Sequence, residues 1–136
     1  MSMKRVTEPE ALFGLGKKVD DPAHFSGEVY VREIASFEKP MLMDSVTFAP
    51  GCYNAWHVHQ AGQTLLVTDG RGWYQEEGKP AQELLPGDIV DIPAGIKHWH
   101  GAAKDSSFTH LAVEDWSKGA PEWFELLDAD EYAKLR

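Results

Sequence analysis

Short runs of apolar, β-branched and aromatic residues alternate with turn residues from Glu28 to Glu114. Turn sequences such as Ala49-Pro50-Gly51 and Pro86-Gly87-Asp88 separate the runs, and each can reverse the chain. The pattern predicts strands near residues 28–34, 41–48, 55–60, 63–68, 71–76, 81–85, 88–92, 97–101 and 107–114. Their spacing is typical of an all-β barrel or jelly roll.

The two ends of the chain depart from this pattern. Residues 1–25 hold a few apolar positions broken by Gly14 and Gly16, which indicates an irregular N-terminal arm. Residues 121–127 fit either an edge strand or a helical turn, and residues 128–135 predict a short, capped C-terminal helix. We therefore expect one barrel domain over residues 26–136, preceded by the arm.

Composition and charge limit the classes of molecule that we expect the protein to bind. The formal net charge is −9 and no cluster of Lys or Arg stands out, so we expect a small-molecule substrate and neither nucleic acid nor membrane. The polar start lacks a signal peptide's apolar core, and no apolar run approaches the roughly 20 residues that span a bilayer, which favours a cytoplasmic protein. Cys52 is the single cysteine, so imidazole and oxygen must hold any bound metal.

Four of the six histidines form two pairs, His57-Val58-His59 and His98-Trp99-His100. Each pair is two residues apart in a predicted strand, so both members face the same side of the sheet. Gln63 alternates with Leu65 and Val67 and can point into the same interior. A single histidine is usually a surface or core residue, but two such pairs on strands that converge favour a metal site.

The spacing of these residues extends to the surrounding glycines. Five residues separate Gly51 from His57 and six separate Gln63 from Gly70, while Gly87, Pro93-Ala94-Gly95 and His98 form a second string. Both strings resemble the two motifs of the cupin superfamily, which has glutamate where Gln63 stands and usually asparagine where Ala102 stands. The resemblance implies a single-domain cupin jelly-roll barrel and one divalent metal ion held by His57, His59, Gln63 and His98.

A narrower resemblance covers most of the chain. It is carried by Trp56-His57-Val58-His59, Gly62-Gln63-Thr64-Leu65, His98-Trp99-His100-Gly101-Ala102, Thr109-His110-Leu111-Ala112 and the segment from Trp123 to Tyr132. These strings are similar to the bacterial manganese-dependent cupin hydroxynitrile lyases and their relatives of unknown activity. The resemblance implies manganese, although iron, nickel, cobalt or zinc would also suit these ligands. A neutral Gln63 would leave the metal with more positive charge than glutamate does.

Strand parity supplies candidates for the pocket wall. His110, Ala112 and Glu114 share one face, and the resemblance favours Asp44, Val46 and Phe48 as the inward set of their strand. His110 and His100 are therefore candidates for moving a proton to or from a substrate oxygen, and Asp44 is a third catalytic candidate. Glu114 is an alternative pocket residue, and each of these side chains could instead only line the pocket.

The sequence is compatible with three functions. The first is a metal-dependent lyase that cleaves or forms cyanohydrins, as the resemblance implies. The second is a cupin dioxygenase or other oxidoreductase acting on a phenolic or dicarbonyl substrate, and the third is a non-catalytic cupin that binds metal or a small ligand. We also expect a homodimer or higher homo-oligomer, because Val29, Val31 and Ile34 offer an apolar strand for exchange.

Overall fold

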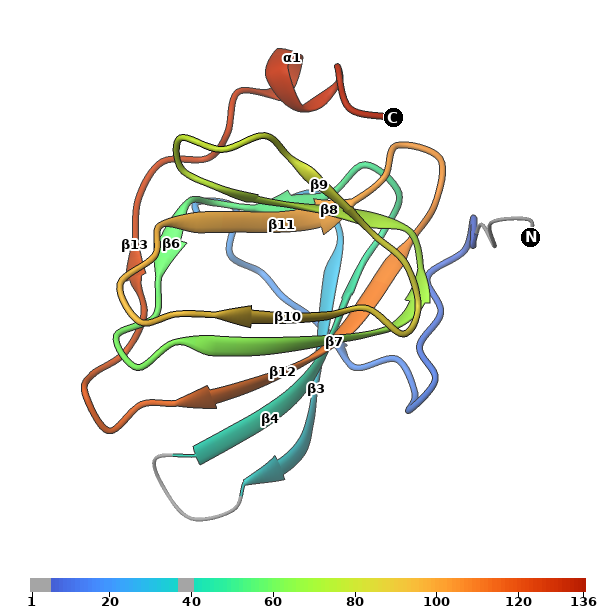
Figure 1. The fold of residues 1–136 in the computed structure, drawn as a ribbon. Coiled ribbons are helices and arrows are strands. Elements are labelled where there is room, and N and C mark those ends of the chain that lie inside the picture. Colours follow the sequence, from blue (N-terminus) through green and yellow to red (C-terminus); the bar gives the residue numbers. More distant parts are fainter. Residues whose placement is uncertain (1–5, 37–40) are drawn as a thin grey trace.

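The computed structural model describes residues 6–36 and 41–136. Within these residues the chain forms two curled antiparallel sheets that face each other, with one short helix near the C-terminus (Figure 1). The predicted all-β jelly-roll barrel with a short C-terminal helix is therefore confirmed.

The first sheet forms one wall of the barrel. In spatial order its strands are β1 (Lys17–Lys18), β3 (Val29–Ser36), β4 (Met41–Phe48), β12 (Phe108–Asp115), β7 (Gln63–Gly70) and β10 (Ile89–Ile92). β12 lies between β4 and β7 and pairs with both, so three long strands form the middle of this wall.

The second sheet carries the two histidine pairs. Its main path is β13 (Glu122–Trp123), β6 (His57–Val58), β11 (His98–Ala102), β5 (Tyr53–Asn54) and β2 (Phe25–Ser26), and β8 (Gly72–Glu76) joins β11 to β9 (Gln82–Leu84). His98 is directly opposite His57 in the β11–β6 pair. The arrangement therefore brings both predicted histidine pairs to one place.

The strand predicted over residues 55–60 is interrupted, and this corrects the sequence analysis. It is replaced by β5 and β6, because Ala55 donates its N–H to the His24 carbonyl (2.7 Å) while Trp56 donates to the Glu125 carbonyl (3.0 Å). Neighbouring residues thus bond to segments from opposite ends of the chain, which interrupts the strand, although β5 and β6 both pair with β11.

The C-terminal segment contains the edge strand rather than the helical turn that residues 121–127 allowed, and its helix is shorter than expected. Glu122–Trp123 is the edge strand β13, and the helix α1 extends only over Ala129–Tyr132. Asp128 occupies the N-cap position but makes no side-chain capping bond, so the expected cap is wrong. Figure 1 shows α1 beside β8 and β9, on the opposite side of the barrel from β3 and β4.

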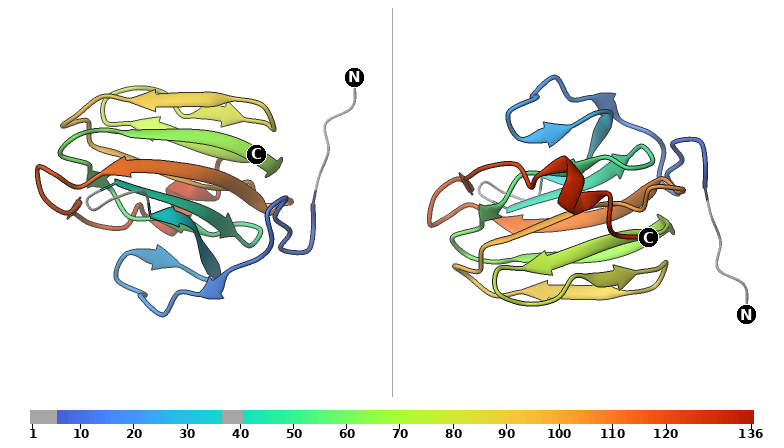
Figure 2. Two further views of the ribbon diagram at one scale, coloured as in Figure 1. Left: turned by 90° about the horizontal axis from the view of Figure 1, so that it is seen from below. Right: turned by 90° about the horizontal axis from the view of Figure 1, so that it is seen from above.

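The described part of the predicted arm, residues 6–25, is bound to the barrel. Leu12 donates its N–H to Asp69 Oδ1 (2.8 Å), and Thr109 Oγ1 donates to the Glu10 carbonyl (2.6 Å). In both views of Figure 2 the blue N-terminal segment and the yellow segment around residues 80–95 lie at opposite ends of the barrel. The division at residue 25 stays a prediction, and residues 1–5 lie outside the described residues.

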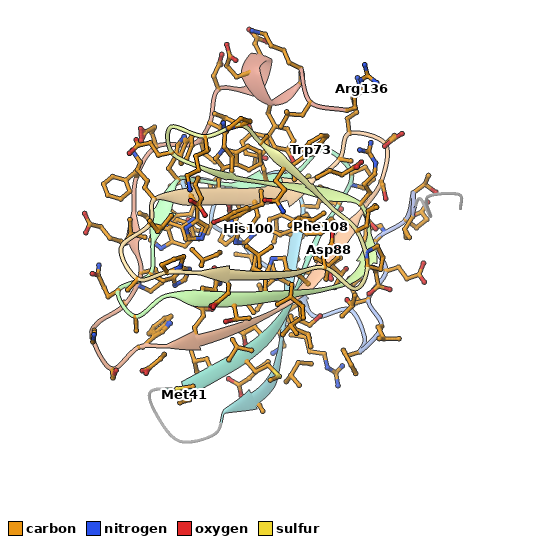
Figure 3. The ribbon with its side chains drawn as sticks, in the orientation of Figure 1. Met41, Trp73, Asp88, His100, Phe108 and Arg136 are labelled. Carbon is orange, nitrogen blue, oxygen red and sulfur yellow. The ribbon has the colours of Figure 1, made fainter. Side chains whose placement is uncertain are left out.

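The interior divides into an apolar part and a polar part. The apolar core joins both sheets through Val29, Phe48, Leu65, Val67, Tyr74, Leu84, Ile92, Ala102, Phe108 and Ala112. Beyond this core the inward positions become polar, and the histidines gather there. Figure 3 shows His100 inside the barrel, while Met41 and Arg136 lie at its periphery. No helix in the described ranges is long and apolar enough to cross a membrane.

Candidate functional site

Three histidines from β6 and β11 form a compact cluster inside the barrel. One ring nitrogen from each of His57, His98 and His100 lies within 4.8 Å of the other two, and all three residues are buried. Alternation along β11 puts His98 and His100 on the inner face, while Trp99 packs on the outer face in a separate apolar cluster. The protein therefore has a three-histidine site that could hold a divalent metal.

Hydrogen bonds fix the orientation of two of these rings. His57 Nδ1 lies 2.7 Å from the Ala55 carbonyl, and His98 Nδ1 lies 2.9 Å from the Ile96 carbonyl. A carbonyl can only accept, so each imidazole donates through Nδ1–H and keeps the lone pair on Nε2. This is the tautomer that a metal-binding histidine needs.

His59 is held differently. Its Nδ1 lies 3.0 Å from Glu114 Oε1, and its Nε2 is buried with no hydrogen-bond partner among the described residues. In metal sites, one ring nitrogen of a ligand histidine binds the metal, and the other commonly donates its hydrogen to a carboxylate. The orphaned Nε2 thus fits a metal ligand.

The turn after His59 directs Gln63 into the barrel. The His59 carbonyl accepts N–H bonds from Gly62 (3.1 Å) and Gly95 (3.2 Å), and Gly62 has φ +84°. A Cβ at Gly62 would lie 2.7 Å from the Ile92 carbonyl oxygen, so glycine is required on both counts. Gln63 Oε1 then lies 3.4 Å from His98 Nε2.

The four ligands predicted from the sequence therefore surround one region. The most compact group of ring nitrogens, however, is not the predicted set. The ring centroid of His57 lies 4.2 Å from that of His98 and 5.0 Å from that of His59. His100, expected only as a catalytic candidate, belongs to the compact cluster, whereas His59 lies outside it. The ligand roles of His59 and Gln63 stay predictions.

Burial keeps these imidazoles neutral. Desolvation, followed by the neighbouring His98 and His59, holds the pKa of His57 well below its ordinary value. Burial likewise lowers the pKa of His98 to about 4. Because neutral imidazole is the form that binds metal, the donor set fits a divalent cation at neutral pH.

A second histidine pair lies deeper in the barrel. His110 Nε2 is 3.1 Å from His100 Nδ1, and Asn54 fixes His100 by accepting its backbone N–H at Oδ1 (2.9 Å). Burial lowers the pKa of His110 to about 4, and its Nδ1 has no partner among the described residues. His110 is therefore a buried, neutral base with one nitrogen free to meet a ligand.

Two carboxylates complete the polar wall. Asp44 lies opposite Ala112 in the β4–β12 pair, and burial, with the nearby charges of Glu114 and Glu33, raises its pKa to about 6. Burial acts to raise the pKa of Glu114, but its contacts with His59 and Trp116, together with the nearby His110, outweigh that effect and lower the pKa. Asp44 can thus exchange a proton near neutral pH, whereas Glu114 stays ionised.

Most of these groups border one cavity of about 200 Å³. The polar part of its lining contains the residues described above apart from His98. His110 and Glu114, which strand parity placed on one face, and Asp44 and Val46, which the resemblance favoured as inward residues, all border the cavity. The rest of the lining is apolar or aromatic and consists of Phe25, Val31, Trp116, Pro121 and Trp123. The volume is below the usual range for drug-sized ligands, so a small molecule fits.

Among the site residues that sequence reasoning missed, two contact the histidines directly. Asn54 fixes His100, and Trp123 stands directly opposite His57 in the β13–β6 pair. Neither follows the alternation of a predicted strand, because β5 and β13 are only two residues long. Both residues reach the site because segments distant in the sequence pair with each other, and no local sequence pattern predicts such pairing.

Comparison with known proteins agrees with this geometry. The family model for the cupin domain matches residues 44–114. The (R)-mandelonitrile lyase of Granulicella tundricola is 43% identical over 113 residues, which cover 81% of this chain and 86% of that protein.

Solved structures show the same fold. A cupin-like protein from Thermotoga maritima is 38% identical with a TM-score of 0.85, covering 93% of this chain and 97% of that one. A cupin-2 domain protein from Rhodospirillum rubrum, 18% identical, superposes with a TM-score of 0.71 over 97% of this chain and 88% of that one. By motif, sequence and fold, this chain belongs to the cupin superfamily and resembles its hydroxynitrile lyases.

Proposed function

We propose that the protein is a metal-dependent lyase that cleaves or forms a small cyanohydrin, with manganese as its favoured metal. The observation that carries the proposal is the pairing of the relative named (R)-mandelonitrile lyase with a small cavity lined by neutral imidazoles. His57, His59, Gln63 and His98 would hold the metal. A bound divalent ion would supply positive charge beside the substrate oxygen or the nitrile.

His110 is the proposed base for the substrate hydroxyl. Its buried Nδ1 has no partner among the described residues, and its pKa of about 4 keeps it neutral and able to accept a proton in the cavity. In the cleavage direction Nδ1 takes the hydroxyl proton while the bond between the carbinol carbon and the nitrile breaks. The products are an aldehyde or ketone and cyanide. His100, 3.1 Å from His110 Nε2, orients the ring and shares the positive charge.

Asp44 is the proposed acid. Its pKa of about 6 leaves much of the carboxyl protonated in mildly acidic solution, and it lines the same cavity. It gives its proton to the departing cyanide, and the proton held by His110 returns to Asp44 through solvent. The cycle therefore begins and ends with the same protonation states.

The activity test uses the protein loaded with Mn²⁺ and racemic mandelonitrile near pH 5.5, with benzaldehyde followed by absorbance. We expect cleavage above the spontaneous rate, preference for one enantiomer, and loss of at least about a hundredfold in His110→Ala. Phe13→Ala, which removes an exposed ring outside the cavity lining, is the control. No cleavage above the blank by the loaded protein would contradict the proposal, and oxygen consumption with phenolic or dicarbonyl compounds would favour the oxygenase instead.

A further inference from the structure

An aromatic stack connects the N-terminal arm to the histidine cluster. The ring of His24 lies parallel to that of Trp123, with centroids 4.4 Å apart and an interplanar angle of 13°. Trp123 in turn packs against His57, with centroids 4.7 Å apart and an angle of 30°. Both contacts join residues that are far apart in the sequence.

The backbone brings the arm to this place. The His24 carbonyl accepts the Ala55 N–H at 2.7 Å, and Ala55 is the residue whose carbonyl accepts from His57 Nδ1. On the other side, Trp123 is paired in register with His57. The arm and the edge strand β13 therefore meet at the residues that orient one ring.

His24 is itself held by a tight turn. Its backbone N–H donates to the Asp21 carbonyl (3.1 Å), and its Nδ1 lies 2.8 Å from Asp21 Oδ2. Since a carboxylate beside imidazole favours donation from Nδ1–H, this contact fixes the ring plane that Trp123 meets. Phe25 adds an edge contact to Trp123, with centroids 5.6 Å apart.

The hydrogen bond from His57 Nδ1 to Ala55 selects a tautomer but leaves the ring able to tilt about that bond. The flat face of Trp123 restrains this tilt, because offset stacking favours near-parallel planes. Outer contacts of this kind contribute to metal affinity by keeping a ligand's lone pair directed at the ion. The His24 side chain does not border the cavity, so its ring would act only through Trp123.

We propose that Asp21 and His24 of the N-terminal arm are positioning residues that act through Trp123 to hold the His57 ring in its metal-binding orientation. The inference rests on the proposed metal site and extends it to a segment that carries no ligand. It assigns the arm a role in the chemistry, where the sequence suggested only an irregular lead-in.

The test measures Co²⁺ affinity and the visible absorption spectrum of the bound ion, which reports ligand geometry, in the full-length protein. We expect His24→Leu, which fills the space but cannot stack, to weaken Co²⁺ binding about fivefold and to alter the spectrum. His24→Phe, which keeps a flat ring, should restore most of the affinity. Phe13→Ala, which removes an exposed ring from the same arm, is the matched control and should bind as the unsubstituted protein does.

A double-mutant cycle tests the route through Trp123. In a Trp123→Leu background, His24→Leu should cause no further loss of affinity. Full affinity and an unchanged spectrum in His24→Leu, or equal losses from that substitution with and without Trp123, would overturn the inference. Thermal melts of each variant separate a folding defect from a local one. If the unsubstituted protein binds no Co²⁺, the proposed metal site itself fails, which is a different result.

Discussion

At the residue scale, Glu114 changes the electrostatics expected from Gln63. A glutamine ligand should leave the site more positive than the usual cupin glutamate does. However, the Glu114 carboxylate contacts His59 at 3.0 Å, and Asp44 borders the same cavity. These two carboxylates thus supply negative charge beyond the proposed ligands. There they can orient a ligand without binding the metal themselves.

The first residue-scale prediction separates His59 from His100 as a ligand. We expect His59→Ala to lose most of its bound Mn²⁺ after dialysis, since its orphaned Nε2 is free to bind the ion. His100→Ala should keep near-stoichiometric metal and lose turnover, because its Nδ1 is engaged with His110. Metal analysis of both variants decides the question, and the reverse pattern would assign the ion to the compact cluster of His57, His98 and His100.

The second prediction concerns Asp44 and pH. Its folded-state pKa of about 6 lies above the ordinary value of 3.8, so the folded state binds the proton more tightly than the unfolded chain. The resulting stability is fully present below about pH 3.8 and is lost as the pH rises through 6. At pH 7.5 the ionised carboxylate, near Glu33 and Glu114, therefore destabilises the fold, although His110 lines the same cavity.

Asp44→Asn should accordingly raise the free energy of unfolding by about 1 kcal/mol at pH 7.5, well below the full linkage value because Asp44 is only half-buried. At pH 4.5 the gain should shrink by more than half. Urea denaturation at the two pH values provides the measurement, with Asp20→Asn on the arm as control. A gain that does not change with pH would show that the carboxylate charge is not its cause.

At the element scale, the long strands could be predicted and the short ones could not. β4, β7 and β12 keep their alternation over eight residues each, so parity grouped their residues by face, and the family resemblance selected the inward face of β4. The break between β5 and β6 depends on hydrogen bonds to His24 and Glu125, which lie far away in the sequence. The spacing of the motif residues predicted that His57, His59, Gln63 and His98 would meet in one region, whereas Asn54 and Trp123 come from two-residue strands that have no detectable period.

Gly70, at the end of β7, gives the element-scale prediction. It has φ +75°, and a Cβ there would lie 1.8 Å from the Ser107 carbonyl oxygen. Gly70→Ala should therefore destabilise the fold by about 3 kcal/mol, through both backbone strain and displacement of β12. Gly78 has φ +83°, but a Cβ there would meet no atom within 4 Å among the described residues, so Gly78→Ala should lose only about 1 kcal/mol. Equal losses in urea denaturation would contradict the steric argument.

At the scale of the whole molecule, the second sheet separates two different environments. His98 and His100 belong to the histidine cluster on the inner face of β11, while Trp99 on the other face packs with Tyr53 and Tyr132. Tyr132 in α1 stacks on Tyr53, with centroids 4.1 Å apart, and donates its hydroxyl to the Ala102 carbonyl at the end of β11. The C-terminal helix thus supports the histidine-bearing strand from behind.

Two substitutions of Tyr132 should therefore lower the free energy of unfolding by different amounts. Tyr132→Ala should lower the free energy of unfolding by about 3 to 4 kcal/mol, because it removes a buried ring. Tyr132→Phe keeps the ring and should lose about 1 kcal/mol with its hydrogen bond. Thermal and urea denaturation measure both, and bound metal in Tyr132→Phe should be unchanged. An equal effect of the two variants would show that the ring contributes no packing energy.

The homodimer expected from the sequence stays a proposal at this scale. In the described residues β1 pairs with β3 at Tyr30 and Val31, and Ile34 farther along β3 is 37% exposed. A second copy could cover this apolar position. We expect light scattering to give the mass of a dimer, and a monomer mass would exclude strand exchange.

The contact of Glu114 with Trp116 provides an internal optical probe. Trp116 is 40% exposed where it lines the cavity, and its Nε1 donates to the same Glu114 oxygen that meets His59, at 3.2 Å. Any event that draws His59 toward or away from Glu114 therefore alters the surroundings of one indole. Because the chain has five tryptophans, the fluorescence lost in Trp116→Phe isolates this signal, which can follow changes at the His59–Glu114 contact without a label.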